Sequence, residues 1–480
     1  MTRADAGPLL AAGAVVAGIV AGEWMGPSAA TALLLGGVVL AVAALGLRSG
    51  PVALCALVVL GGASMQRALH GLVDSPLSGA VEARSRAVVH GELVIDPKVY
   101  PYSVRVRVRV HDAEIDGRPV GVDRILLVRA GGDVAMRLGV LDAGDGVTLA
   151  GALEPLDGWD SRERWNHAVG LLRADELVSF APPDDPLGRV ANRLRRRVVA
   201  GLASLPATER ALASSFLLGD DRALPTETVE EFRAAGMTHL LVVSGSNVAF
   251  ALALCAPILR WLGLRPRFLA GIGVLLVFGT MTRWEPSVLR AVVMAAIVMT
   301  GVLLGRPSRG LRVLALAVTA LLLVDPFLVH SVAFLLSCGA TGGIAALAAP
   351  FAARLRGPRW WRDVFATTVA AELGVAPVLV AVFGSVPLVA LPANVAAVPP
   401  AGMITIGGLA VGVGGGLARP WMPEIADLVT VPVGALLTYE RAVAALAARV
   451  PIELTAAPAV LLAALVALAA VVGRARRLPA

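Results

Sequence analysis

Polar residues interrupt one of the most apolar stretches of the chain, Gly236 to Gly263. These residues are His239, Ser244, Gly245, Ser246 and Asn247. An unpaired polar group in hydrocarbon costs several kcal/mol, so such residues are kept facing a bundle interior or a water-filled path. Gly245 would allow a helix break whose free amides face phosphate. The segment predicts the path of a channel or transporter, and the alternative is interhelical hydrogen bonding at ~0.6 kcal/mol per bond.

A second chemical pattern is the alternation of valine and arginine in Ser103 to Val110. A strand with this period places Arg105, Arg107 and Arg109 on one face, ~6.6 Å apart, which suits phosphate contacts. A solvated charged face without a ligand is the alternative. Single-strand binding also needs aromatic rings for stacking, and the candidates are Tyr100, Tyr102, Trp159 and Trp165. The pattern fits DNA contact and a solvated face equally.

Three further polar residues fall inside apolar segments: Arg290, Glu372 and Asn394. Intramembrane polar residues of this kind are functional candidates by default. Arg290 and Glu372 could form a buried ion pair, or Arg290 could contact entering phosphates. The glycine-rich run from Gly412 to Leu417 lacks the Lys-Ser/Thr of a P-loop, so we expect ATP hydrolysis to come from a partner.

Composition decides the broad class. Of the 480 residues, 57% are hydrophobic and 16% are charged, and the mean hydropathy is +0.77, which lies outside the range of soluble proteins. The net charge of +7 first indicates anchoring of cytoplasmic loops, and nucleic acid or anionic lipid second. The three cysteines show no CxxC spacing, so neither a disulfide framework nor a zinc site is indicated.

The apolar runs predict a polytopic α-helical membrane protein with about 12 spans. Three lie in an N-terminal membrane segment, residues 1–75, where the first run favours a retained helix over a cleaved signal peptide. Residues 236–480 hold nine more, at 236–260, 267–282, 286–304, 311–325, 327–349, 363–384, 387–415, 425–447 and 455–473. The 387–415 run contains Pro392, Pro399 and Pro400, which favours a broken helix or a re-entrant pair.

Between these segments the pattern changes to short alternating stretches separated by turn signals such as Asp116-Gly117. Residues 80–181 therefore predict an inserted small closed β-barrel. Residues 182–235 predict a linker followed by amphipathic helices at the membrane surface. Arginines concentrate in alternate short loops, and the positive-inside rule then places both termini inside and the β domain outside.

Taken together in this order, the β domain, the LLGDDRALP stretch (217–225) and HLLVVSGSNVAF (239–250) resemble the ComEC family of inner-membrane competence proteins. The segment 158–174 is similar to the one that closes the OB-like domain of that family. The matched positions are Leu217, Leu218, Gly219, Asp220, Phe232, Arg233, Gly236, His239, Leu240, Ser244, Gly245, Pro286, Ser287, Leu289, Arg290, Gly305, Arg306, Asp325, Pro326, Phe334, Ser337 and Asn394.

The resemblance implies a multi-pass protein of the bacterial cytoplasmic membrane, a channel for uptake of single-stranded DNA in natural transformation. It also implies a separate DNA receptor, a separate nuclease and a cytoplasmic ATPase as partners. Two alternatives need no DNA: a secondary transporter of a small anionic solute or lipid precursor, and a membrane scaffold whose β domain docks another envelope protein.

Two departures from the family pattern bear on chemistry. Asn247 stands where the family usually has histidine, and asparagine keeps hydrogen bonding without proton chemistry. Many members carry a C-terminal metallo-β-lactamase-like part, whereas this sequence ends in RARRLPA and its six histidines are scattered. We therefore expect no nuclease or other enzyme activity, no metal and no cofactor in this polypeptide.

Overall fold

The computed structural model describes residues 3–25, 30–47, 49–306, 310–450 and 453–455. By contacts the chain divides into two compact units. The barrel unit comprises Gly7–Arg193 and Thr319–Ser331, and the helical unit comprises Met1–Ala6, Leu194–Val318 and Val332–Ala480.

The barrel unit begins with helices α1 (Arg3–Met25), α2 (Ala30–Leu47) and α3 (Gly50–Val73). Helices α1 and α3 approach through small residues: a Cβ on Gly22 would lie 2.7 Å from the carbonyl oxygen of Gly62, and one on Gly61 would lie 2.5 Å from that of Val15. Any side chain there would push the two backbones apart.

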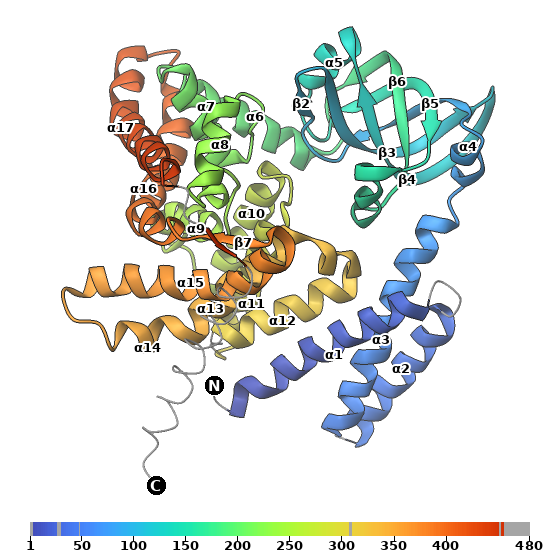
Figure 1. The fold of residues 1–480 in the computed structure, drawn as a ribbon, viewed down its shortest axis with the longest axis horizontal. Coiled ribbons are helices and arrows are strands. Elements are labelled where there is room, and N and C mark those ends of the chain that lie inside the picture. The colour runs from blue at the N-terminus through green and yellow to red at the C-terminus, as the bar shows by residue number, and fades with distance from the viewer. Residues whose placement is uncertain (1–2, 26–29, 48, 307–309, 451–452, 456–480) are drawn as a thin grey trace. The chain divides into compact units, whose positions relative to one another are not determined.

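The barrel itself has OB-like topology (Figure 1). Its elements are α4 (Ser78–Glu82), β1 (Arg86–Leu93), β2 (Lys98–Tyr100), β3 (Ser103–Ile115), β4 (Arg118–Ala130), α5 (Gly132–Gly139), β5 (Gly146–Glu154), η1 (Gly158–Asn166) and β6 (Ala168–Ala181). The sheet order is β1-β5-β6-β4-β3-β2, and an additional β1–β3 pairing closes the barrel with β2 outside it. Strands β4 and β6 are parallel, and the other pairs are antiparallel. The predicted small closed barrel is confirmed.

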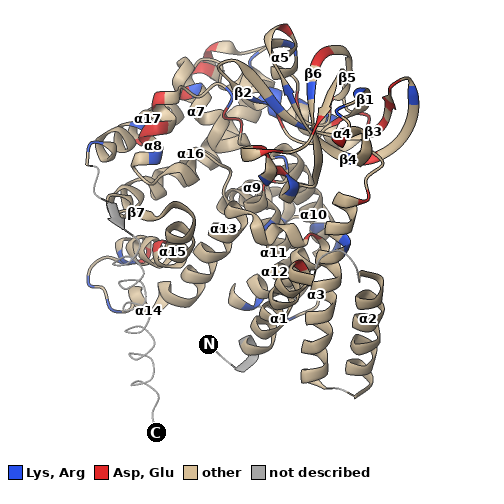
Figure 2. Ribbon diagram, turned by 45° about the vertical axis from the view of Figure 1, so that its right-hand side comes forward, with Lys and Arg blue, Asp and Glu red and all other residues tan. Residues whose placement is uncertain are grey.

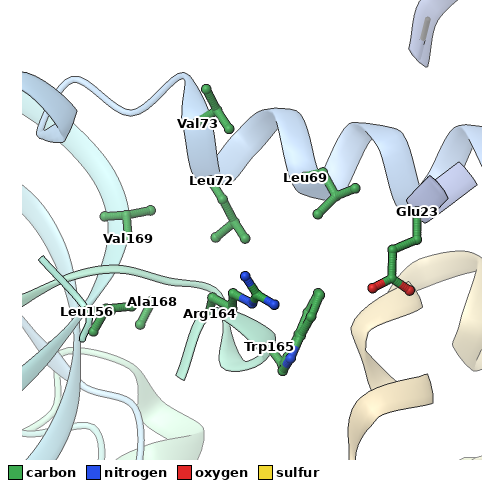
Figure 3. Close-up of a pocket in the computed structure, with 9 residues that line it drawn as sticks. All are labelled: Glu23, Leu69, Leu72, Val73, Leu156, Arg164, Trp165, Ala168 and Val169. Atoms are coloured by element: carbon green, nitrogen blue, oxygen red, sulfur yellow. The ribbon is translucent and has the colours of Figure 1, made fainter. Parts of the chain in front are cut away.

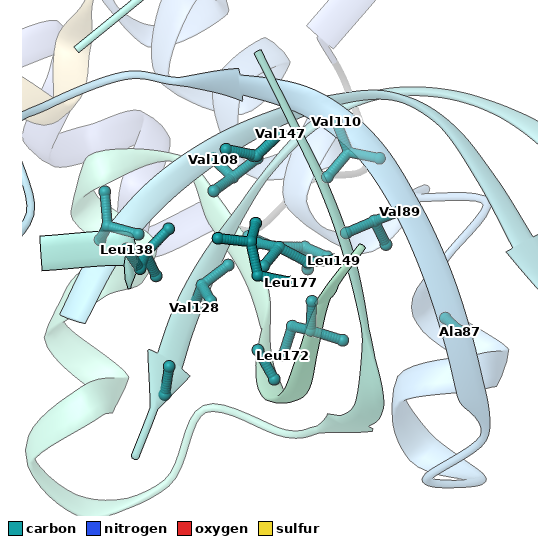
Figure 4. Close-up of a cluster of buried hydrophobic side chains, with 14 of the residues drawn as sticks. Ala87, Val89, Val108, Val110, Val128, Leu138, Val147, Leu149, Leu172 and Leu177 are labelled. Carbon is teal, nitrogen blue, oxygen red and sulfur yellow. The ribbon is translucent and has the colours of Figure 1, made fainter. Parts of the chain in front are cut away.

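Alternation along β3 builds the barrel core as predicted. Val104, Val106, Val108 and Val110 are all at most 2% exposed, and they join leucines of β4, β5, β6 and α5 in one apolar cluster (Figure 4). Asp116 and Gly117 have φ of 49° and 80°, the positive values that a two-residue type I′ hairpin turn needs between β3 and β4. Inward valines leave the arginines of β3 on the outer face.

The helical unit continues the chain from within α6. Its elements are α6 (Pro186–Gly201), α7 (Ala207–Leu218), α8 (Thr226–Ala234), η2 (Thr238–Leu240), α9 (Gly245–Leu259), α10 (Leu264–Met281), α11 (Pro286–Leu303), α12 (Gly310–Val324), α13 (Val332–Gly343), η4 (Ile344–Ala348), α14 (Ala349–Ala352), α15 (Arg359–Phe383), β7 (Ser385–Pro387), α16 (Ala390–Ala418), α17 (Pro423–Ala448) and β8 (Glu453–Thr455). The end of α12, from Thr319 onward, and the turn η3 (Pro326–His330) that follows it belong to the barrel unit.

Over the described residues of both units, ten helical segments are long and apolar enough to cross a membrane, and α12 is a shorter apolar helix. The predicted polytopic membrane fold is confirmed. The predicted span at 455–473 lies outside the described residues.

Helix α16 corrects the prediction of a broken or re-entrant segment at 387–415. It is one continuous helix, Ala390–Ala418, with Pro399 and Pro400 inside it. A proline has no N–H, so the carbonyls four residues earlier lose their helical donors. The Tyr439 hydroxyl of α17 donates to one of them, the Ala396 oxygen, at 3.4 Å. The helix therefore persists because a neighbouring helix replaces part of the lost bonding.

The glycine-rich run 412–417 is a packing surface. A Cβ on Gly412 would lie 2.8 Å from the Val198 side chain of α6, and one on Gly416 would collide with the Arg197 carbonyl. By contrast, a Cβ on Gly414 would meet nothing within 4 Å. The glycines of this run that face α6 let the two backbones touch, which is the usual reason for small residues between membrane helices.

Candidate functional site

The apolar segment that holds the candidate path residues is not one continuous helix. It starts with η2, leaves helical geometry after Leu241, and α9 begins at Gly245. Ser244 occupies the N-cap position with extended backbone, φ −91° and ψ 162°. The first amides of α9 have no partner within the helix, as at any helix start. The predicted break at Gly245 is thus present.

Side chains around this break form a local hydrogen-bonded group. The Ser244 and Ser246 hydroxyl oxygens lie 2.5 Å apart, and the Ser244 hydroxyl donates to Asn247 Oδ1 at 3.1 Å. Asn247 is buried, and its Nδ2 donates to the Phe216 carbonyl of α7 at 2.8 Å. Ser246 is exposed. Asn247 therefore ties α9 to α7, while Ser246 presents the accessible edge of the group.

Arg290 lies against the start of α9. A Cβ on Gly245 would be 2.8 Å from Arg290 Nη2 and 3.2 Å from the Ala291 side chain, so a larger residue there would displace the guanidinium. Arg290 is 5% exposed and donates from Nε to the Ser337 hydroxyl of α13 at 3.0 Å. The Ser287 hydroxyl of α11 donates to the Val243 carbonyl at 2.8 Å. A buried cation and the positive end of a helix therefore meet at one place.

Glu372 and Asn394 form a second, separate pair. Asn394 Nδ2 of α16 donates to Glu372 Oε1 of α15 at 2.7 Å, and Asn394 is 3% exposed. The predicted alternative of an ion pair between Arg290 and Glu372 is not formed: Arg290 bonds to Ser337, and Glu372 bonds to Asn394. His239, exposed on η2, makes no hydrogen bond to the serine group within the described part of the chain. The structure thus joins Ser244, Gly245, Ser246, Asn247 and Arg290, and leaves the other three candidates outside that group.

On the barrel, each predicted DNA-contact arginine has an acidic neighbour. Arg105 Nη1 lies 3.1 Å from Asp160 Oδ1, Arg107 Nε lies 4.0 Å from Glu163, and Arg109 Nη1 lies 3.9 Å from Glu92. Asp160 is 8% exposed and also pairs with Arg129, the residue beside Arg105 on β4. The pairs with Asp160 and Glu163 hold η1 against the outer face of β3 and β4, while Glu92 lies on β1.

The two candidate tryptophans of η1 differ in availability. Trp159 is 82% exposed, with the Arg162 guanidinium 5.4 Å from its ring centre. Trp165 is packed: its ring stacks on His330 at 3.8 Å and meets Phe327 edge-on at 5.3 Å. It also lines a cavity of 410 Å³ (Figure 3), together with Glu23, Leu69, Leu72, Val73, Leu156, Arg164, Ala168 and Val169. Of the two tryptophans, Trp159 is therefore the one free to stack on a base. Tyr102, at 93% exposed, and Tyr100, at 46%, are accessible as well.

Residues 216–477 match the sequence profile of a family described as Competence protein. The match covers more than half of the 480 residues. The chain belongs to this family. The predicted resemblance to ComEC proteins is thereby confirmed.

Two curated proteins are similar to this competence-family chain. ComE operon protein 3 of Bacillus subtilis (strain 168) is 25% identical over 239 residues, 49% of this chain and 30% of that protein. Uncharacterized protein YcaI of Escherichia coli (strain K12) is 26% identical over 206 residues, 39% of this chain and 27% of that protein. The chain thus spans less than a third of either relative in these alignments. No solved structure matches.

Sequence reasoning missed the role of Arg195, one of several arginines on a predicted amphipathic helix. Arg195 of α6 is 3% exposed and donates from Nη1 to the carbonyls of Leu218, at 2.9 Å, and Met281, at 2.5 Å. These carbonyls end α7 and α10, where cations are favourable. No sequence pattern separates Arg195 from its neighbours, because only the fold buries it.

Sequence reasoning also missed Glu440 of α17. Its side chain is fully buried, and neither carboxyl oxygen has a hydrogen-bond partner among the described residues. The available signal was an acidic residue deep within the apolar run 425–447, which also contains Asp427 near its start, since intramembrane carboxyls are functional candidates. No group of three or more metal-binding side chains occurs within the described ranges.

Proposed function

We propose that this competence-family chain forms the path by which single-stranded DNA crosses the cytoplasmic membrane in natural transformation. Membership of the Competence protein family supports a role in DNA uptake. The observation that carries the finer proposal is the helix break at Ser244, with Arg290 packed against Gly245 and Ser246 exposed beside them.

This arrangement suits a passing phosphodiester chain. A helix start carries about +0.5 elementary charge, and Arg290 adds a full positive charge close by. Ser244 and Ser246 can donate hydrogen bonds to phosphate oxygens. None of these groups reads a base edge, so the site would accept any sequence. A path needs such weak and repeated attraction, because tight binding would stop transit.

For the barrel we propose an accessory role in receiving single strands through Trp159 and Arg162. Bases of any sequence stack on exposed aromatic rings. In OB-like barrels the loop between the last two strands commonly contributes to oligonucleotide binding, and η1 is that loop here. The arginines of β3 could contact phosphate only by competing with Asp160, Glu163 and Glu92.

The remaining expectations are part of the same proposal. The barrel would lie on the outer face and both termini inside, as the arginine distribution predicts. A separate DNA receptor, a nuclease and a cytoplasmic ATPase would complete the machinery. Secondary transport of an anionic solute or lipid precursor is the second candidate, favoured by Glu372 and Glu440, two acidic residues within apolar helices.

A negative charge introduced at Ser246 tests the proposal. Aspartate near a helix start stabilises the helix, yet it would repel phosphate by ~1–4 kcal/mol at close range. Ser246→Asp should therefore lower uptake of labelled DNA by about tenfold or more, normalised to inserted protein, while the neutral, similarly sized Ser246→Asn retains it. Equal uptake by both variants would contradict a path at the start of α9. Loss of anionic-solute transport, with DNA uptake unchanged, would favour the second candidate.

A further inference from the structure

Glu440 stands apart from the other acidic residues of the helical unit. It lies on the buried stripe of α17, whose members are Ala426, Thr430, Val433, Leu437, Glu440, Ala444 and Ala447. Glu440 is 0% exposed, and neither of its carboxyl oxygens has a hydrogen-bond partner among the residues that the structure describes. Glu372, by comparison, accepts a hydrogen bond from Asn394.

The facing part of α16 is the turn weakened by Pro399 and Pro400. Helices α16 and α17 are joined by a short connection, so they run antiparallel. The Val433 side chain lies 3.6 Å from the Cβ position of Gly407. Glu440 is seven residues beyond Val433, and seven residues before Gly407 is Pro400, about two helical turns in each case. Glu440 is thus level with the prolines, as the bond from its neighbour Tyr439 to Ala396 confirms.

In the described part of the chain, no cation pairs with Glu440. Helix α16 contains no charged residue between Ala390 and Ala418. The charged residues of the other elements packed against α17 are Glu209 and Arg210 on α7 and Glu227, Glu230, Glu231 and Arg233 on α8. Glu209 is paired with Arg441 at 2.9 Å, and Glu230 with Arg233 at 2.9 Å.

An ionised carboxylate without a partner is strongly disfavoured in an apolar interior, whereas a neutral carboxyl is tolerated and can donate one hydrogen bond. The prolines supply acceptors for that bond, because the carbonyls of Val395 and Ala396 have lost their helical donors. A protonated Glu440 would have a proton to donate toward these carbonyls, and an ionised Glu440 would not.

We propose that Glu440 is a proton-binding site that couples the state of α16 to proton uptake and release. On release the O–H bond of the carboxyl breaks, its electron pair stays on the carboxylate, and water accepts the proton. A metal cation would need several oxygen ligands, and the described residues contain no acidic or histidine cluster. A proton, by contrast, binds directly to one carboxyl oxygen and needs no further ligands. That this coupling drives DNA movement rests on the proposed function, while proton binding itself does not.

Infrared difference spectroscopy of the full chain in liposomes tests proton binding directly. Wild type should show the carbonyl stretch of a neutral, buried carboxyl at neutral pH, and Glu440→Gln should lose that band. Glu424→Gln, at the exposed start of α17, is the matched control and should retain it. Glutamine mimics the protonated form, so folding should be preserved. A wild-type spectrum without this band, or with the band unchanged in Glu440→Gln, would overturn the proposal.

Uptake assays then test the coupling. Glu440→Gln should lower DNA uptake at least tenfold at equal membrane abundance, and Glu440→Asp, which keeps a titratable group, should restore part of it. Wild-type uptake by Glu440→Gln would overturn the coupling. Uptake that requires sodium in the buffer would show that Glu440 binds a metal cation and would overturn the proton-binding proposal. If wild type itself moves no DNA, the proposed function fails, and the infrared result still decides proton binding.

Discussion

The barrel and the helical unit differ in the groups to which their charged side chains bond. On the outer face of β3 every arginine meets a carboxylate from η1 or β1, so charge there is matched within the protein. In the helical unit Arg290 bonds to a hydroxyl, Arg195 to two carbonyls and to Asp220 at 3.4 Å, and Glu440 to nothing in the described chain. Figure 2 shows where the charges lie: charged residues are frequent on the strands and sparse along α9, α11 and α16.

This difference helps to distinguish residues that hold the fold from residues that have a further role. Water solvates both partners of a surface pair, so a paired arginine on a barrel adds little free energy and mainly fixes a loop. Within a membrane no water compensates an unpaired group, and such a group persists only with a role. An unpaired polar group in the helical unit is therefore better evidence of a function than a charged residue on the barrel.

The largest expected effect on stability comes from Arg195, which donates hydrogen bonds to the last carbonyls of two helices. Arg195→Met would leave two buried carbonyls without a donor and should lower the free energy of unfolding by about 3–5 kcal/mol. Thermal unfolding of the purified chain measures this change. Arg193→Met, an exposed position on the same helix, is the control and should be nearly neutral. Similar losses in both variants would show that Arg195 contributes only general charge.

The glycine surface between α6 and α16 gives the next effect. A methyl group at Gly416 would collide with the Arg197 carbonyl, so Gly416→Ala should destabilise by about 1–3 kcal/mol. Gly414→Ala points into open space and should stabilise by about 0.5–1 kcal/mol through helix propensity. Thermal shifts of equal sign in the two variants would contradict the packing assigned to this run.

Binding of single strands by the barrel should depend on stacking more than on the arginines. Trp159→Ala should cost about 1–3 kcal/mol of affinity, the value of one stacked base. Trp165→Ala is a poor control because that ring is packed, so Val140→Ala, also exposed, serves instead. Fluorescence anisotropy with a labelled oligonucleotide on the full chain measures both. An unchanged affinity in Trp159→Ala would remove η1 from the binding surface.

The smallest effect is expected from the arginines themselves. Three free phosphate contacts would contribute about 2 units of salt slope, at ~0.7 each. Since Asp160, Glu163 and Glu92 already neutralise them, replacing Arg105, Arg107 and Arg109 by glutamine should reduce the log-log slope by less than about 1 unit. A reduction near about 2 units would mean that DNA displaces the carboxylates. The barrel arginines would then be available to phosphate and not matched within the protein.

The sequence predicted those parts of the molecule that local pattern determines. Alternation in Ser103 to Val110 predicted a strand with buried valines, Asp116-Gly117 predicted a turn, and Gly245 predicted a helix break. Pairings between distant segments were not predictable: Asp160 is 55 residues from Arg105, and no local rule links them. Continuity of α16 depends on Tyr439 of another helix, and the burial of Glu440 depends on which face of α17 packs inward.

Cross-linking of DNA in transit tests the central claim most directly. A photoreactive cross-linker on a cysteine at Ser246, in a chain with Cys55, Cys255 and Cys338 replaced, should capture a strand stalled during uptake. The same probe at Val298, an exposed position on α11, should capture little. We expect strong capture at position 246 only. Uptake that proceeds with no capture at 246, or with equal capture at both positions, would contradict a path along the start of α9.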